Sequence, residues 1–485
     1  MAGFRHGIYS QELATSVVST TPVDASLPVV FGTAPLHLAT EPAEVNKPIL
    51  CSSYQEAVKM LGYSDDWDKY TLCEFMNSHF SLFQMSPVVF INVLDLTKHK
   101  QAVSSKEIAM TNNAVTIVDD VILSSLVVKK ADAGEPLILN TDYIAEYNDD
   151  GNVVITAIEE SEIYDAESIW IEYDRVDASM VEADDIVGGV DITTGALTGL
   201  EVINIVYSKL GMVPGIILAP KWSKDITVAS VIKAKEDNIG GLFLAIGLVD
   251  IPTGEGGVKK YSDINSYKTT KNLVDEKTVV CWPKVALSGK QYHLSTQLAG
   301  VIAQTDSENS DIPYVSPSNK NLQCDSTVLE DGTEVSLDFT AANIVNGVGA
   351  VTAINFTNGW VVWGNRTSIY PSSTDVKDCF IPVRRMFNWI INTMITTYWS
   401  KIDDPTNTVF IKTIVNSVNI WLNSLVSRGF LIGASCQFRQ EDNPVTDLLD
   451  GTVRFYIDLA SPIPAEKIEF IYAYNVEYLN NLFSE

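Results

Sequence analysis

The five histidines are the first residues that could bind a metal. His6, His37, His79, His99 and His293 lie far apart along the chain. The sequence has no HExxH motif and no close histidine pair, the spacing that would place two imidazoles on one helix face around a zinc ion. We therefore predict no metal site.

Acyl transfer by an activated serine is the second chemistry to consider. The sequence lacks the GxSxG turn that exposes a nucleophilic serine at the end of a strand. A triad around His293 would need a serine and a carboxylate from distant segments, and the sequence singles out neither. We assign no catalytic residue, and an α/β hydrolase-like enzyme remains an alternative.

Two short segments have the composition of ligand loops but lack the spacing. Residues 254–260, GEGGVKK, lack the GxxxxGK[ST] pattern that puts a lysine on phosphates and a hydroxyl on a metal. Asp65, Asp66 and Asp68 lack the remaining oxygen ligands of a calcium loop. We predict a surface loop, a solvated turn and no cofactor.

Composition indicates a globular chain of several domains. The 485 residues are 46% hydrophobic, and 33 basic against 61 acidic residues give a net charge of −28. This balance argues against nucleic acid as a partner, because phosphate contacts need clustered lysine and arginine. The six cysteines are widely scattered, so we expect reduced thiols. We expect no secretory signal, and the apolar stretch 240–252 is too short to span a bilayer.

The first hundred residues predict elements of a packed domain. The segment PVVFGT at 28–33 predicts a strand, and residues 86–95 predict a buried strand. Ser53 and Glu56 form a capping-box pattern before a short helix that Gly62 ends. A second helix is predicted over 70–83.

Residues 98–187 differ from the segments around them. They are rich in valine, isoleucine and tyrosine, and Asn148–Gly151 has the turn chemistry of a hairpin. Residues 119–185 hold nineteen acids and three bases, a net of −16. We predict a β-rich insertion on an exposed surface.

From 188 to about 305 predicted helices alternate with apolar strands, which indicates a largely parallel sheet covered by helices. Expected strands cover 213–219, 241–249 and 278–282. Expected helices follow a capping box at Thr198–Glu201, near 226–237, and at 295–304.

The C-terminal third begins with the strongest hairpin signal, Asn358-Gly359 between alternating apolar runs. A helix follows over 382–399, and Asp404-Pro405 can begin the next, with Gly429 at its end. Trp360 and Trp363, three apart on a strand, should point to opposite faces.

The arginines of this third are also informative. Arg384 and Arg385 begin a helix, where positive charge opposes the helix dipole, so we expect the pair to face a carboxylate elsewhere, and a solvated pair is the alternative. Arg366 precedes them.

Residues 451–475 predict two final strands joined by a proline-containing connection. The residues that define the strands are Val453, Phe455, Ile457 and Leu459, then Ile468, Phe470 and Tyr472. At the other terminus Gly7, Ile8 and Tyr9 form one short apolar element. Two strands alone are marginal in water, so these segments need a partner.

An ordered set of segments resembles the tail sheath proteins of contractile phage tails and R-type bacteriocins. In the C-terminal third they are NGWVVWGNRT at 358–367, the Arg384-Arg385 helix, RGFLIGA at 428–434 and YIDLASPIP at 456–464. Further similar segments lie at 6–9, 46–48, 249–254 and 299–306. The acidic region 98–187 is the least similar.

The resemblance implies a mixed α/β and α+β multidomain fold. The expected parts are an N-terminal linking arm (1–22), a discontinuous inner domain (23–97 with 346–485), the acidic β-rich outer insertion (98–187) and an α/β middle domain (188–345). In this family terminal arms add strands to neighbouring subunits, which would be the role of the apolar residues at both ends.

The implied function is that of a structural subunit, not an enzyme. Six copies would form a ring around a tail tube, and the stacked rings would contract to drive the tube through a cell envelope. Expected partners are further copies of the chain and the tube, baseplate and tail terminator proteins, without nucleic acid or membrane insertion. Assembly would occur in the host bacterial cytoplasm, giving a virion tail or a released tail-like particle. A non-assembling adhesin is the remaining alternative.

Overall fold

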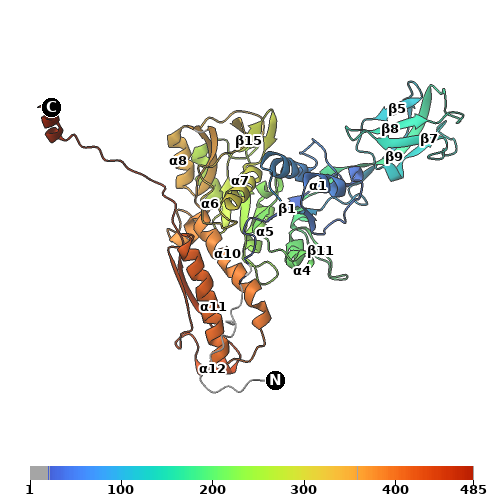
Figure 1. Cartoon of the computed structure of the whole chain (residues 1–485). Coiled ribbons are helices and arrows are strands. Elements are labelled where there is room, and N and C mark those ends of the chain that lie inside the picture. The colour runs from blue at the N-terminus through green and yellow to red at the C-terminus, as the bar shows by residue number, and fades with distance from the viewer. Residues whose placement is uncertain (1–19, 21, 358, 484–485) are drawn as a thin grey trace, which may run out of the picture.

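The computed structural model describes residues 20, 22–357 and 359–483, and an eight-stranded sheet lies at its centre (Figure 1). The strand order is β19-β18-β14-β13-β12-β1-β3-β2. The six inner strands run parallel, while β2 and β19 pair antiparallel at the two edges. The strand bounds are Pro28–Gly32 (β1), Ile49–Cys51 (β2), Val88–Asn92 (β3), Ile216–Leu218 (β12), Ile246–Asp250 (β13), Thr278–Cys281 (β14), Ala350–Phe356 (β18) and Gly359–Trp363 (β19).

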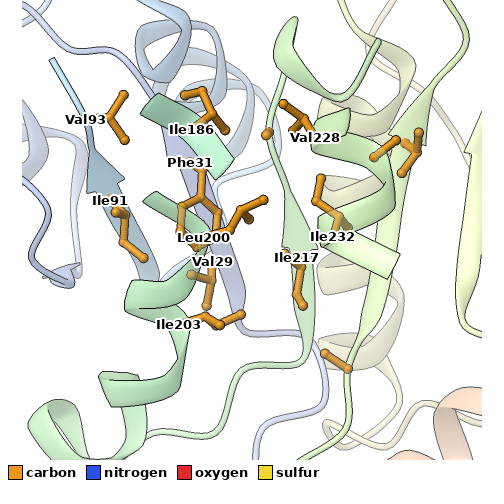
Figure 2. Close-up of a cluster of buried hydrophobic side chains, with 14 of the residues drawn as sticks. Val29, Phe31, Ile91, Val93, Ile186, Leu200, Ile203, Ile217, Val228 and Ile232 are labelled. Carbon is orange, nitrogen blue, oxygen red and sulfur yellow. The ribbon is translucent and has the colours of Figure 1, made fainter. Parts of the chain in front are cut away.

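Helices cover both faces of this sheet. Successive strand residues point to opposite faces, so Val29 and Phe31 enter one core while Val30 enters the other. Figure 2 shows the first core, where Val29 and Phe31 lie near Leu200. Its helices are Ala183–Val187 (α3), Val206–Leu210 (α4), Ile226–Glu236 (α5), Ile264–Thr270 (α6) and Phe339–Gly347 (α8). The second core contains Tyr54–Leu61 (α1), Thr71–Met76 (α2) and Leu294–Glu308 (α7).

The sheet joins segments that the sequence had placed in different domains. Strands from 28–92 and from 216–281 are direct neighbours, because β1 pairs with β12. Residues 23–97 and 188–345 therefore share one α/β unit, which corrects the expected boundary between them. Sequence pattern identified the strands, but strand order depends on contacts between distant segments.

Residues 100–176 form a separate β unit that projects from the body (Figure 1). It consists of two three-stranded sheets, β4-β9-β6 and β5-β8-β7, around its own core. The hairpin predicted at Asn148–Gly151 joins β7 to β8 and is confirmed. The bounds are Lys100–Ala109 (β4), Ala114–Ile117 (β5), Val127–Lys129 (β6), Tyr143–Tyr147 (β7), Val153–Ala157 (β8) and Ser168–Val176 (β9). Residues 177–187 instead pack into the main core through Val181 and Ile186.

One predicted helix start differs in the structure. The capping box at Thr198 does not form, since the Thr198 hydroxyl pairs with the backbone of Gly189 and Glu201 pairs with Lys235. Thr198 belongs to a small ribbon of Gly189–Val190 (β10) and Leu197–Thr198 (β11). A further sheet contains Lys284–Leu287 (β15), Lys290–Tyr292 (β16) and Ser326–Val328 (β17).

The C-terminal part is a helical layer beside the sheet (Figure 1). Its elements are Val376–Cys379 (α9), Ile381–Tyr398 (α10), Thr408–Ser427 (α11), Gly433–Gln437 (β20), Val445–Leu449 (α12) and Tyr456–Ala460 (β21). Helix α11 begins later than predicted, because Asn407 rather than Asp404 caps it, accepting from the Phe410 amide at 2.9 Å. By length and composition α11 could cross a membrane, yet Trp421 on this helix packs against Trp389 of α10 at 5.5 Å between ring centroids.

The predicted pairing of the two C-terminal strands with each other is wrong for the single chain. Strand β21 pairs with β20, from Tyr456 opposite Gln437 to Ala460 opposite Gly433. Residues 461–475 contain no helix or strand, and the chain extends away from the body after Glu466 (Figure 1). Alternating apolar residues correctly identified both segments as extended. Strand β20, which packs against α11, lies nearer to β21 and pairs with it instead.

Candidate functional site: the β20–β21 ribbon and the C-terminal tail

The two-stranded ribbon of β20 and β21 is half of a candidate assembly site. Its inner face packs on α11, and Phe455, Ile457 and Leu459 lie half-buried against the helical core. Val453 is also half-buried. Neither strand pairs with a third strand in the part of the chain that the structure describes. An open strand edge is a template for another extended chain.

The other half is the segment that follows the ribbon, residues 467–483, hereafter the C-terminal tail. Its described large apolar side chains are exposed, among them Phe470 at 76%, Ile471 at 93% and Tyr472 at 90%. Ile468 is exposed as well. Exposing several large apolar groups together forgoes about 1.5–3 kcal/mol of burial for each. Residues 467–475 of the tail therefore have the composition of a buried strand without a surface to cover it, and a 3-10 helix, Val476–Phe483, follows them.

Arg366 holds the start of this tail against the body. Its Nε and Nη2 donate to the two carboxylate oxygens of Glu466 at 2.7 and 2.5 Å. The guanidinium also lies over the Phe380 ring at 3.8 Å and the Tyr370 ring at 4.5 Å. Such a planar, two-pronged contact fixes direction as well as distance. The tail thus departs from a defined point.

The Arg384 and Arg385 pair faces carboxylates, as predicted. Arg385 is buried, donates to Asp306 Oδ1 at 3.0 Å and also contacts Oδ2. Arg384 lies 3.3 Å from Asp378. Burial raises the pKa of Asp306, and Arg385 opposes this shift. Arg385 thereby ties α10 to the end of α7, and Arg384 ties it to α9.

The two tryptophans of β19 occupy opposite faces of the sheet, as expected from their spacing. Trp360 packs against the second core and donates to the Asp325 carbonyl at 2.9 Å. Trp363 packs beside α8 and donates to Asn343 at 3.1 Å. Both are structural in this chain. Gly7, Ile8 and Tyr9 lie outside the described residues.

The residues needed for hydrolase chemistry do not converge into a triad in the described part of the chain. His293 Nδ1 lies 2.7 Å from Glu74 Oε2, but its Nε2 has no hydroxyl partner. Ser295 instead bonds Asp250 through its amide at 3.0 Å and through its hydroxyl. Sequence reasoning missed both carboxylates. The signal for Asp250 was its place at the end of a buried strand.

Metal binding has no support in the described residues, where no three His, Cys, Asp or Glu side chains cluster around a common point. All six cysteines are free thiols.

No protein-family model matches the chain. The curated tail sheath protein of Burkholderia phage BcepMu is 26% identical over an alignment of 497 residues that covers 99% of both chains. The tail sheath protein of Escherichia phage P2 is 24% identical over 61% of this chain and 72% of its own length. These matches make the chain a homologue of phage tail sheath proteins.

Solved structures give the same fold for the sheath chain. The contracted sheath complex of the extracellular contractile injection system PVC matches with a TM-score of 0.56 and 14% identity, covering 98% of this chain and 99% of that one. The contracted helical sheath of the anti-feeding prophage (AFP) matches with a TM-score of 0.57 and 14% identity, covering 97% and 99%. Both matches extend over the insertion and the C-terminal part.

Proposed function

We propose that this sheath chain is the structural subunit of a contractile tail. Its copies form hexameric rings that stack around a tail tube, and contraction of the stack drives the tube through a target cell envelope. The observation that carries this proposal is the match along 99% of a phage tail sheath protein. It covers the ribbon and the tail together.

Strand exchange between copies would connect the stack. The C-terminal tail of one subunit would pair with an open edge of the β20–β21 ribbon of a neighbour, which supplies the backbone partners that each lacks. Each added backbone hydrogen bond contributes about 0.5–1.5 kcal/mol net. The Arg366–Glu466 contact would keep the donor subunit attached to its own tail while the bodies rotate.

The N-terminal arm, residues 1–22, would add a second linking strand through Gly7, Ile8 and Tyr9. Removing residues 2–14 should then abolish tubes and leave a folded monomer. Tubes of normal length from this variant would show that the arm is not a link.

The radial order within the sheath follows from charge. The acidic insertion would face outward, where a Debye length of about 8 Å screens like charges at physiological salt. The C-terminal third has thirteen acids and ten bases between 360 and 485 and would face the tube. Baseplate and tail terminator proteins would contact the two ends of the stack, in a virion tail or tail-like particle assembled in the host cytoplasm.

Negative-stain microscopy of the purified full-length chain tests the proposal. We expect hollow tubes with six-fold symmetry. Monomers at high protein concentration, with an ordered tail, would instead support a binding module that does not assemble.

A further inference from the structure

A cavity of about 600 Å³ opens at the carboxyl ends of the central parallel strands. Lys221 and Lys224 follow β12, and Lys284 follows β14 and begins β15. His293, directly before α7, and Glu74 of α2 lie on its wall. The wall also includes Lys290 and the acidic residues Asp65, Asp66, Asp68 and Glu330. No part of the sheath assembly described above uses this cavity.

The topology makes this place a binding crevice. The strands that follow β1 in the sequence, β2 and β3, lie on one side of β1 in the sheet. Strands β12, β13 and β14 lie on the other side, in that order. The order of strands therefore reverses between β1 and β12. Open α/β sheets bind ligands outside the carboxyl ends of the strands at such a reversal, because the flanking loops separate there.

The lysines of the cavity are only partly neutralised. Lys224 pairs with Glu330 and Lys290 pairs with Asp65, while Lys221 Nζ donates to the Asp68 carbonyl at 2.5 Å. Lys284 has no ion pair or hydrogen-bond partner for its ammonium group within the described residues. Burial, with the nearby Lys284 charge, lowers the pKa of Lys224 to about 8.

Lys221 adds a second unusual feature. Its φ of 68° lies in the left-handed region that lysine rarely adopts, and such backbone strain is concentrated at functional sites.

His293 contributes a buried atom without a partner. Both Glu74 oxygens are used, one by the His293 amide at 2.7 Å and one by Nδ1 at 2.7 Å. Burial acts to raise the pKa of Glu74, but the charges around it, Lys284 among them, lower it overall. The carboxylate therefore accepts the Nδ1 proton, and in the neutral ring Nε2 has a lone pair to accept another. His293 is 4% exposed, and Nε2 has no partner among the described residues.

We propose that this cavity binds free hydrogen phosphate. The ammonium groups of Lys221, Lys224 and Lys284 would contact its unprotonated oxygens, and its single hydroxyl would donate to His293 Nε2. At neutral pH the dianion of a phosphate monoester has no proton to donate, and neither has sulfate. The site would therefore distinguish hydrogen phosphate from sulfate and from phosphate monoesters by the proton that only hydrogen phosphate can donate.

Isothermal titration of the soluble full-length chain at pH 7.5 and constant ionic strength tests the proposal. We expect one saturable site for inorganic phosphate and binding about tenfold weaker or more for sulfate, because sulfate would leave a buried acceptor unpaired. Lys284→Met should weaken phosphate binding about tenfold or more, since a charged hydrogen bond is lost. Lys412→Met, which removes an exposed positive charge on α11, should leave it unchanged.

If circular dichroism shows that Lys284→Met does not fold, Lys221→Met replaces it in the test. We expect this variant to lose phosphate affinity to the same extent. The proposal is overturned by equal affinity for phosphate and sulfate or by unchanged affinity in the folded lysine variant. It is also overturned if about 10 mM phosphate gives no binding heat, because a site with a Kd of about 1 mM would then be about nine-tenths full.

Discussion

At the scale of single residues, buried ion pairs fix how the helices of this chain pack against one another, as Arg385 of α10 and Asp306 of α7 do. Sequence reasoning predicted that Arg384 and Arg385 face carboxylates, because charge at a helix start needs compensation. It did not name the partner, since Asp306 lies 79 residues away along the chain. Only the packing of α10 against α7 brings the two together.

Arg385→Met should destabilise the fold by about 3–5 kcal/mol, because it leaves the Asp306 carboxylate buried without its partner. Urea unfolding of the monomer measures the loss. Arg439→Met is the matched control, since Arg439 pairs with Asp458 at the surface and should cost less than about 1 kcal/mol. Equal losses in the two variants would contradict this account of the buried pair.

Glu236 predicts a dependence of stability on pH. Burial raises the pKa of Glu236 well above its ordinary value, and both its oxygens lie within 3.0 Å of the Thr278 hydroxyl. Above pH 4–5 the unfolded chain loses this proton while the folded chain keeps it, so stability falls as pH rises towards the folded pKa. The slope approaches about 1.4 kcal/mol per pH unit for one proton.

Glu236→Gln keeps the shape and removes the titration. The variant should therefore be more stable than the wild type at pH 8 and similar to it at pH 4, as measured by urea unfolding across this range. A variant less stable than the wild type at pH 8 would show that the carboxylate is ionised and favourable in the fold.

At the scale of elements, the structure separates what a pattern can predict from what it cannot. Period-two alternation correctly marked 453–459 as extended, and Asn358-Gly359 correctly marked the β18–β19 hairpin. The pairing of β21 with β20 was missed, because alternation carries no information on which strand lies beside it. The tail from 468 to 472 has no partner in its own described chain.

Phe470→Pro tests the tail without disturbing the body. Phe470 is 76% exposed, so we expect an unfolding free energy within about 0.5 kcal/mol of the wild type, while tubes are lost because proline cannot donate to a strand ladder. Sedimentation and negative-stain microscopy measure mass and assembly. Phe470→Val, which stays apolar and favours strands, should still form tubes.

Ile457→Pro is a less specific test than sequence alone indicated. Ile457 pairs with Cys436 inside the ribbon and packs on the helical core, so its replacement also damages the monomer. Normal tubes from Phe470→Pro would contradict strand exchange through the tail.

At the scale of the whole molecule, the largely parallel sheet and the β-rich insertion were predictable from residue pattern. Their assembly was not, because the pairing of β1 with β12 links segments separated by the entire insertion. The chain enters and leaves the insertion side by side, where the Asp177 amide donates to the His99 carbonyl at 3.0 Å. Lys69 and Asp120, 3.0 Å apart, add a contact between the two.

Replacing residues 100–176 by Asn-Gly tests the outward position of the insertion. The two ends already meet, so a two-residue turn can join them. The main core loses Val176 and the contact of Ile122 but keeps its other residues. We expect tubes of smaller outer diameter and unchanged inner diameter in negative stain. A change confined to the inner diameter would place the insertion against the tube.

Cryo-electron microscopy of assembled wild-type tubes tests the central claim most directly. The account predicts that residues 467–475 of one subunit form a strand along the open edge of the β20–β21 ribbon of a neighbour, with Arg366 and Glu466 still paired in the donor. Tubes in which each tail folds back on its own chain, or lies free in solvent, would contradict it.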